Sequence, residues 1–294
     1  MHRVKEMMFG TGVPFDYMEC TECGTISLVD PPADMQPYYA DDYYSYYGLV
    51  SSPLWKNVLK KIRLSLYFHF NINPPLYGEW LKLSNARKNH KIADIGCGNG
   101  QLLYEMYACG YQQLEGYDPF IEKDLEINDS LKLYKKDIFE IPSNADFDLI
   151  MMHHAFEHMA KPKEIVQKAY ELLKPGGLLL IRIPVADAQV WEEYGVHWVQ
   201  LDAPRHFFIH TKKSMAIMAE EAGFETEKIV FDSTGFQFWG SELYKAGISL
   251  QDGKDLRMFT SEQIDVWENR ANELNHQQKG DQACFYLRKR GLKY

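Results

Sequence analysis

The spacing of apolar residues changes along this chain, and the change predicts its elements. From Pro53 to about Ala86 they recur every three or four positions, which is typical of helices, with a break at Asn73-Pro74-Pro75 and a second helix predicted over Leu76–Leu83. After that, short apolar runs alternate with helical patterns. The predicted strands are Ile92–Ile95, Gln113–Tyr117, Leu131–Lys135, Phe147–His153, Leu178–Ile183, Thr226–Asp232 and Ala283–Arg288. The predicted helices between them are Gln101–Ala108, Pro162–Leu173 and Lys213–Ala222.

Strands that alternate with helices predict an α/β fold in which helices cover both faces of a mostly parallel sheet. We therefore expect a Rossmann-like, doubly wound sheet of seven strands, preceded by an irregular N-terminal segment. Changes in composition divide the chain into three parts. Residues 1–50 form the N-terminal segment, 51–248 the α/β domain, and 249–294 a polar helical excursion that leads into the last strand.

Composition excludes several classes of protein. The 294 residues are 46% hydrophobic, enough for one large domain with appendages or for two domains. A net charge of −9 without an evident basic stripe makes nucleic acid a poor candidate partner. No apolar run is long enough to insert across a membrane, and no signal peptide is recognised. Five scattered cysteines favour a reduced, cytoplasmic location. The oligomeric state stays open.

The most informative motif is the segment Ala93–Gly100, which joins a predicted strand to a predicted helix. Gly96, Gly98 and Gly100 let the backbone approach a ligand, and the helix that follows presents free N–H groups. Asp118 ends the next strand, about twenty residues further on, where a ribose diol is bound in doubly wound folds. An ordinary turn aspartate before proline is the alternative. Together these features predict a cofactor that contains adenosine.

The spacing of the glycines narrows the choice of cofactor. A dinucleotide fingerprint requires its third glycine where this chain has Gln101, and no Lys-Ser or Lys-Thr follows as in a Walker loop. Asp94 would repel a pyrophosphate but suits a cationic amino-acid group. The resulting pattern, D-x-G-x-G-x-G, resembles the first motif of the class I methyltransferases that depend on S-adenosylmethionine (SAM).

Two further segments carry this resemblance. Lys136-Asp137-Ile138 ends the third strand, and the resemblance implies that Asp137 accepts a hydrogen bond from adenine while Ile138 packs on the ring. A helix N-cap is the alternative for Asp137. Leu172–Gly177 reads Leu-Leu-Lys-Pro-Gly-Gly, which is highly characteristic of this superfamily and predicts a tight turn into the fifth strand. The resemblance also implies that the last strand runs antiparallel. Further residues expected around the cofactor are Cys97, Tyr117 and His153.

A histidine-rich turn follows the strand Phe147–His153, at the edge where open α/β sheets bind ligands. The pattern His154-x-x-Glu157-His158 also matches an inverted zinc-protease motif, which its position at a strand end does not suit. The resembled family often has a version of it. His158 and His154 are candidates for a general base or for the wall of the cofactor pocket. Bracing of the turn is the structural alternative.

A second candidate region, Trp198–His206, follows the fifth strand and closes over the methyl donor in many members of the resembled family. Here Trp198 would wall an acceptor pocket, Arg205 would bind a polar acceptor, and His206 would bind or deprotonate it. A salt-bridged loop with a packing tryptophan is the alternative. Tyr43 and Tyr44 are candidates for a flap over the acceptor, and plain packing is equally consistent with the pattern.

Cys20 and Cys23 have the spacing of one zinc knuckle, whereas a tetrahedral site needs four ligands. One methyltransferase branch, which includes sugar C-methyltransferases, carries an N-terminal zinc ribbon with two such pairs. The resemblance implies that these cysteines are the second pair and that the first would precede Met1. We therefore expect an incomplete zinc site.

These observations predict a SAM-dependent methyltransferase that acts on a small polar acceptor, such as a sugar or nucleotide-linked sugar, and releases S-adenosylhomocysteine. The sugar is inferred from the family alone. His158 and His206 are the preferred bases, with His154 third. Two alternatives remain: a SAM-binding regulatory protein without catalysis, and a nicotinamide-dependent oxidoreductase, which the early third glycine disfavours.

Overall fold

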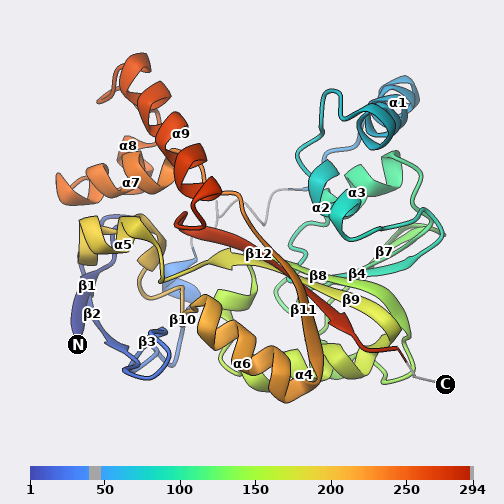
Figure 1. Cartoon of the computed structure of the whole chain (residues 1–294), viewed down its shortest axis with the longest axis horizontal. Coiled ribbons are helices and arrows are strands. Elements are labelled where there is room, and N and C mark those ends of the chain that lie inside the picture. The colour runs from blue at the N-terminus through green and yellow to red at the C-terminus, as the bar shows by residue number, and fades with distance from the viewer. Residues whose placement is uncertain (40–47, 292–294) are drawn as a thin grey trace.

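The computed structural model describes residues 1–39 and 48–291, so Tyr43 and Tyr44 lie outside the described residues. Its centre is an eight-stranded sheet of order β11-β12-β9-β8-β4-β5-β7-β6 (Figure 1). The strands are β4 (Lys91–Ile95), β5 (Gln113–Tyr117), β6 (Leu125–Asn128), β7 (Leu131–Tyr134), β8 (Phe147–His153), β9 (Leu173–Pro184), β11 (Phe224–Phe231) and β12 (Gln282–Lys289).

The order of the strands confirms the doubly wound, mostly parallel sheet. β4 pairs in parallel with β5 on one side and β8 on the other, and β7 and β9 extend the sheet in both directions. β12 lies antiparallel between β9 and β11, which confirms the expected direction of the last strand. The carboxyl ends of the parallel strands therefore meet at one edge, where α/β sheets bind ligands.

Two details of this sheet differ from the prediction. β6 is an additional edge strand, antiparallel to β7, whose exposed and half-buried side chains lack an alternating apolar pattern. β9 is assigned from Leu173, but the Lys-Pro-Gly-Gly segment has no partner in β8, because the pairing passes from Phe147 with Leu173 to Leu149 with Leu178. The segment therefore loops out of the sheet with Gly176 at φ 78°, as the predicted turn requires, and the difference from the prediction is only that the strand is assigned from before this turn.

Helices cover both faces of the sheet, and each face has its own apolar core (Figure 1). α4 (Pro162–Leu172) and α6 (Lys212–Ala222) pack on one face. α1 (Leu54–Phe70), α2 (Gly78–Leu83) and α3 (Gln101–Ala108) pack on the other. Leucine and isoleucine from alternate positions of the strands fill the two cores, which is why the strands read as apolar runs.

The N-terminal segment is more regular than the sequence predicts. β1 (His2–Lys5), β2 (Pro14–Glu19) and β3 (Ile26–Leu28) form an antiparallel sheet with β10 (Phe208–Ile209). The strands are short, and one of the two partners of β3 is β10, about 180 residues away, so local patterns give little sign of them. A third core joins this sheet to α5 (Gln189–Tyr194), α7 (Phe236–Lys245) and α9 (Ser261–His276), beside the short α8 (Leu250–Gly253).

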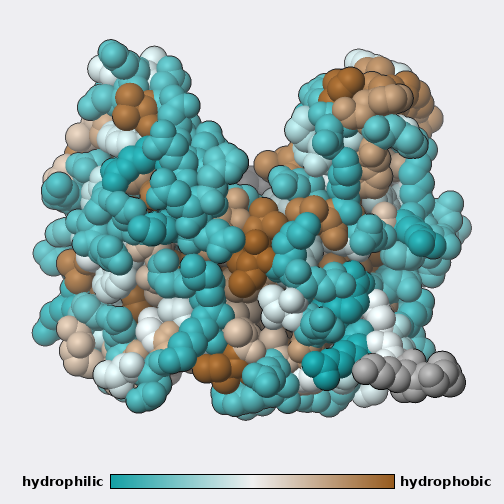
Figure 2. All heavy atoms as spheres, viewed as in Figure 1, coloured by the Kyte–Doolittle hydropathy of each residue, from teal (hydrophilic) through white to brown (hydrophobic). Residues whose placement is uncertain are grey.

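The surface is hollowed between α9 and the lobe of α1, α2 and α3 (Figure 2). Single 3-10 turns lie in the loops of the described chain: η1 (Gln36–Tyr38), η3 (Ile138–Glu140), η4 (Phe156–His158), η5 (Gly195–His197) and η6 (Val199–Leu201). Within the described residues, every helix falls short of the length and apolarity needed to cross a membrane.

Candidate functional site

The turn between β4 and α3 is built from glycines in the left-handed region. Gly96, Gly98 and Gly100 have φ values of 76°, 52° and 77°. A Cβ on Gly96 would lie 2.4 Å from the Cβ of Ala155, and one on Gly100 would lie 2.7 Å from Leu133 Cδ1. Both conformation and space therefore require glycine, so that the loop exposes bare backbone at the edge of the sheet.

Asp118 connects the end of β5 to this loop. Its Oδ2 accepts a hydrogen bond from the Gly98 amide at 2.9 Å, and its Oδ1 accepts one from the Phe120 amide at 2.8 Å. A carboxylate has about four acceptor sites, so each oxygen keeps room for one more donor. Two neighbouring hydroxyls of a ribose fit this arrangement, and the ribose contact stays a prediction.

Asp94 is the penultimate residue of β4, just before the glycine turn, and is only 4% exposed. Burial and the nearby carboxylate of Asp118 raise its pKa to about 8, so the group is largely neutral at pH 7 unless a cation approaches. Cys97 is a neighbour of Asp94. Burial, followed by the charges of Asp94 and Asp118, raises the pKa of the Cys97 thiol well above its usual value. Cys97 is therefore a packing residue of the loop and not a nucleophile.

Three of the predicted cofactor residues are placed differently from what the resemblance implies. The Tyr117 side chain points into the core, stacks on Tyr134 at 5.2 Å and donates to Glu115 at 2.6 Å, so only its backbone carbonyl reaches the glycine loop. Ile138 is 3% exposed and packs in the same core. Asp137 is exposed and caps η3 by accepting from the Phe139 amide at 2.8 Å, which is the N-cap alternative. Its contact with adenine stays a prediction.

His153 ends β8 under the ring of Trp80, with 4.4 Å between ring centroids. Within the described part of the chain, neither ring nitrogen has a hydrogen-bond partner. Burial, followed by the charges of Arg182 and His154, holds the pKa of His153 well below its usual range. A neutral ring with unused nitrogens suits the wall of a polar pocket. Trp80 could not be predicted as a neighbour of His153, because the two residues are far apart along the chain.

His154 is held between two charged groups. It adopts φ 50°, its Nδ1 lies 3.3 Å from Glu157 Oε1, and its Nε2 contacts the guanidinium of Arg182. Arg182 in turn donates to Asp232 at 2.6 Å. Nδ1–H therefore donates to the carboxylate while Nε2 accepts from the arginine. Because both nitrogens are engaged, His154 is the weakest of the three candidate bases.

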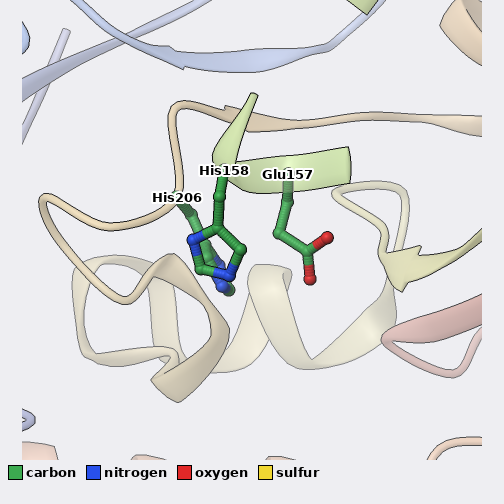
Figure 3. Close-up of side chains that lie close together, drawn as sticks. All are labelled: Glu157, His158 and His206. Atoms are coloured by element: carbon green, nitrogen blue, oxygen red, sulfur yellow. The ribbon is translucent and has the colours of Figure 1, made fainter. Parts of the chain in front are cut away.

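Glu157 and His158, both in η4, come together with His206 from the loop before β10 (Figure 3). The two imidazole rings lie 4.7 Å apart. His158 Nδ1 lies 2.9 Å from the carbonyl oxygen of Arg205, and His206 Nδ1 lies 2.7 Å from that of Gln200. If each Nδ1–H donates to its carbonyl, both Nε2 atoms keep a lone pair.

Burial and the neighbouring side chains together set the pKa values of this cluster. Burial opposes the charge on Glu157, but the hydrogen bond to His154 and the nearby His158 lower its pKa to about 2. Its Oε2 has no partner among the described residues. Burial, followed by His158, lowers the pKa of His206 to about 4, so the ring is neutral at pH 7.

Two imidazoles and a carboxylate are ligands that zinc and similar divalent ions accept. The ligand atoms of Glu157, His158 and His206 all lie within 4.8 Å of one another. Across residues 1–39 and 48–291 this is the one such grouping of three or more potential ligands. It would have to contract to meet metal–ligand distances of about 2.1 Å.

Trp198 and Arg205 do not line an acceptor pocket, contrary to expectation. Both are fully buried. Arg205 forms ion pairs with Glu6 at 3.1 Å and with Asp202, and it also donates to the carbonyl of Tyr38. Trp198 Nε1 donates to the buried carboxylate of Asp281 at 3.0 Å. The alternative of a salt-bridged loop with a packing tryptophan is therefore correct, and these residues attach the N-terminal sheet to the main domain.

Cys20 and Cys23 lie in the turn between β2 and β3. The Cys23 thiol donates to Thr25 Oγ1 at 3.3 Å. Among the residues that the structure describes, no further histidine, cysteine or carboxylate joins the pair as a ligand group. A zinc site at this position is not supported.

The edge of the sheet, with its left-handed glycine turn and the aspartate of the next strand, defines the class: a class I, SAM-dependent methyltransferase fold. The methyltransferase domain family matches residues 74–229, which is more than half of the chain. The protein belongs to this family, whose cofactor is SAM.

The curated relatives share about 30% identity or less with this chain over the matched residues. The chain is 27% identical over 168 residues to a tRNA U34 carboxymethyltransferase of Helicobacter pylori (strain G27), covering 52% of this chain and 63% of that protein. It is 30% identical over 162 residues to a ubiquinone biosynthesis O-methyltransferase of Dinoroseobacter shibae, covering 51% and 65%. The match thus spans less than two thirds of either relative. Among solved structures, the cyclase SpnF is similar, with a TM-score of 0.50, 15% identity, and coverage of 83% of this chain and 99% of that one. That likeness shows the fold alone.

Proposed function

We propose that this protein transfers a methyl group from SAM to a small polar acceptor. The single observation that carries the proposal is the left-handed turn of Gly96, Gly98 and Gly100 with the Asp118 carboxylate fixed against it. SAM supplies an electrophilic methyl group. In the proposal, Asp118 accepts from the ribose hydroxyls, and Asp94 becomes ionised opposite the amino-acid group.

His158 is the better of the two remaining bases. It is half-buried, whereas His206 is 5% exposed and has its pKa lowered to about 4, which weakens it as a base. His206 and the carbonyl of Arg205 orient the His158 ring, so that its Nε2 can take a proton from an acceptor hydroxyl. Positioning of the reactants in a dry site supplies much of the remaining catalysis.

The acceptor is proposed from the family. A sugar or nucleotide-linked sugar follows from the resemblance to sugar methyltransferases. The relatives named above act on other acceptors by their names, a tRNA and a ubiquinone precursor, so these are the competing classes. The overall charge of −9 disfavours a nucleic acid.

Calorimetric titration of S-adenosylhomocysteine tests the cofactor assignment. Asp118→Ala removes two charge-assisted hydrogen bonds, each worth about 1.5–3 kcal/mol, so we expect affinity to fall about 100-fold or more. Asp129→Ala, an exposed turn aspartate, is the matched control and should bind like wild type. Equal affinity of Asp118→Ala and wild type would contradict the ribose contact.

Turnover distinguishes catalysis from binding alone. The assay follows S-adenosylhomocysteine release with a panel of nucleoside-diphosphate sugars and with unmodified tRNA as acceptors. Loss of a general base costs about 10²–10⁴-fold, so His158→Ala should lose turnover while its affinity for S-adenosylhomocysteine is unchanged. His276→Ala, on the exposed side of α9, is the control. Binding of the cofactor without turnover on any acceptor would favour the regulatory alternative. A response to nicotinamide cofactors instead would favour the oxidoreductase.

A further inference from the structure

Helix α1 exposes an apolar face that no part of the described chain covers. Its inner side packs on α2 and α3 through residues such as Leu64, which is 3% exposed. The opposite side carries large apolar residues that are between 40% and 83% exposed. These residues, spaced three and four apart along the outer side, are Leu54, Trp55, Val58, Leu59, Ile62, Leu66 and Phe70. Ile72 and Leu76, in the segment that follows the helix, are also exposed.

This outer face lies at the tip of its lobe. Hydrophobic atoms gather at the upper right of the molecule, over α1 (Figure 2). Scattered exposed apolar residues are common on protein surfaces, whereas a continuous stripe along four turns of helix marks an interaction surface. We call it the α1 face.

Positive charge surrounds the α1 face. Helix α1 contains Lys56, Lys60, Lys61 and Arg63 and no acidic residue. Residues 54–91 contain eight lysines and arginines against one acid, in a chain whose net charge is −9. At 100° per residue, Lys56 and Arg63 flank one side of the apolar stripe and Lys61 flanks the other. The chain therefore does have a local basic region, which its overall composition conceals.

We infer that the α1 face docks on the surface of an anionic membrane. A helix with aromatic and aliphatic residues on one side and lysines and arginines at its flanks lies in a lipid interface, where the apolar stripe enters the acyl boundary and the basic side chains meet lipid phosphates. The helix lies on the membrane and does not cross it.

Charge argues against other occupants. A two-fold dimer through the α1 face would bring the basic flanks of both copies together, which costs free energy. RNA would meet the lysines but would leave the apolar stripe in water. An anionic bilayer satisfies both parts of the surface.

Docking would place the cofactor edge near the lipid. The loop before α1 is bonded to α3, because Tyr104 Oη accepts from the Ser52 amide at 2.8 Å and Gln101 Oε1 accepts from Val50 at 2.9 Å. Lys60 and Glu105 form an ion pair at 2.7 Å between α1 and α3. Since α3 begins at the glycine turn, the α1 face and the proposed SAM site belong to one rigid unit.

Co-sedimentation of the full chain with vesicles tests this inference. We expect binding to vesicles of equal parts phosphatidylcholine and phosphatidylglycerol, release by high salt, and little binding to phosphatidylcholine alone. Because Trp55 is 61% exposed, its fluorescence should shift to shorter wavelength on binding, and Trp55→Leu should lose that shift. Failure to bind the anionic vesicles at low salt would overturn the inference.

Two double variants separate the apolar and electrostatic contributions. Trp55→Ser/Ile62→Ser and Lys56→Glu/Lys61→Glu should each weaken vesicle binding about tenfold or more, with unchanged affinity for S-adenosylhomocysteine. The matched controls, Ile217→Ser and Lys123→Glu/Lys254→Glu, change exposed residues elsewhere and should bind like wild type. Vesicle binding that survives both α1 variants would refute the assignment. So would dimerisation or tRNA binding through this face without vesicle binding.

Discussion

Replacement of Gly96 by alanine tests whether the glycine turn has the geometry on which the site depends. Two effects add at this position. A left-handed backbone, here φ 76°, costs an L-residue about 1–2 kcal/mol. The new Cβ would also lie 2.4 Å from that of Ala155, well inside the contact distance of about 3.5–4.0 Å. Forcing such a contact in a packed region typically costs about 1–3 kcal/mol.

Gly176 supplies a matched control because it shares the backbone and lacks the contact. Its φ is 78°, and a Cβ there would have no atom within 4 Å. Gly176→Ala therefore measures the backbone cost alone. We expect Gly96→Ala to lower the free energy of unfolding by about 2–5 kcal/mol, and by about 1–3 kcal/mol more than Gly176→Ala.

Urea denaturation of the two variants and wild type measures both values, provided that the slopes agree. Because Ala155 must move away from the turn, Gly96→Ala should also lose affinity for S-adenosylhomocysteine, whereas Gly176→Ala should not. If the two variants unfold at the same urea concentration, the close approach of the turn to Ala155 is wrong.

Three further predictions concern buried charges. Arg205→Met should destabilise the protein by about 3–5 kcal/mol, because the carboxylates of Glu6 and Asp202 would lose their partner inside the protein. Arg257 is exposed, so the control Arg257→Met should change stability by less than about 0.5 kcal/mol. Equal urea midpoints for the two variants would contradict this prediction. Burial lowers the pKa of His210 from 6.5 to about 4, so this residue alone should reduce stability by up to about 3 kcal/mol as the pH drops from 6.5 to 4. His210→Phe should therefore make the loss of stability between pH 6.5 and 4 smaller than in wild type, while His206 and His153 keep their contributions. Asp94 has a pKa of about 8 and should release up to about one proton when SAM binds at pH 7. Calorimetry in buffers of different ionisation enthalpy should detect this proton release for wild type and not for Asp94→Asn.

The sequence by itself determined the main sheet. Gln113–Tyr117 and Phe147–His153 were predicted with their observed bounds, and the α3 helix over Gln101–Ala108 was as well. Each depends on a pattern within a few neighbouring residues, which is set by alternation of burial along a strand or a helix. The glycine turn was predictable for the same reason, since its conformation follows from residue type.

Only the tertiary structure decided which side chains meet. His158 and His206 lie next to each other across 48 positions, and Arg205 pairs with Glu6 across 199. The sequence left open whether Arg205 binds an acceptor or a carboxylate, and the N-terminal strands showed too little pattern to be recognised. Periodicity indicates which face of a helix or strand is buried, but it does not indicate which other segment packs against that face. Partners are chosen by packing and charge between segments that are distant along the chain.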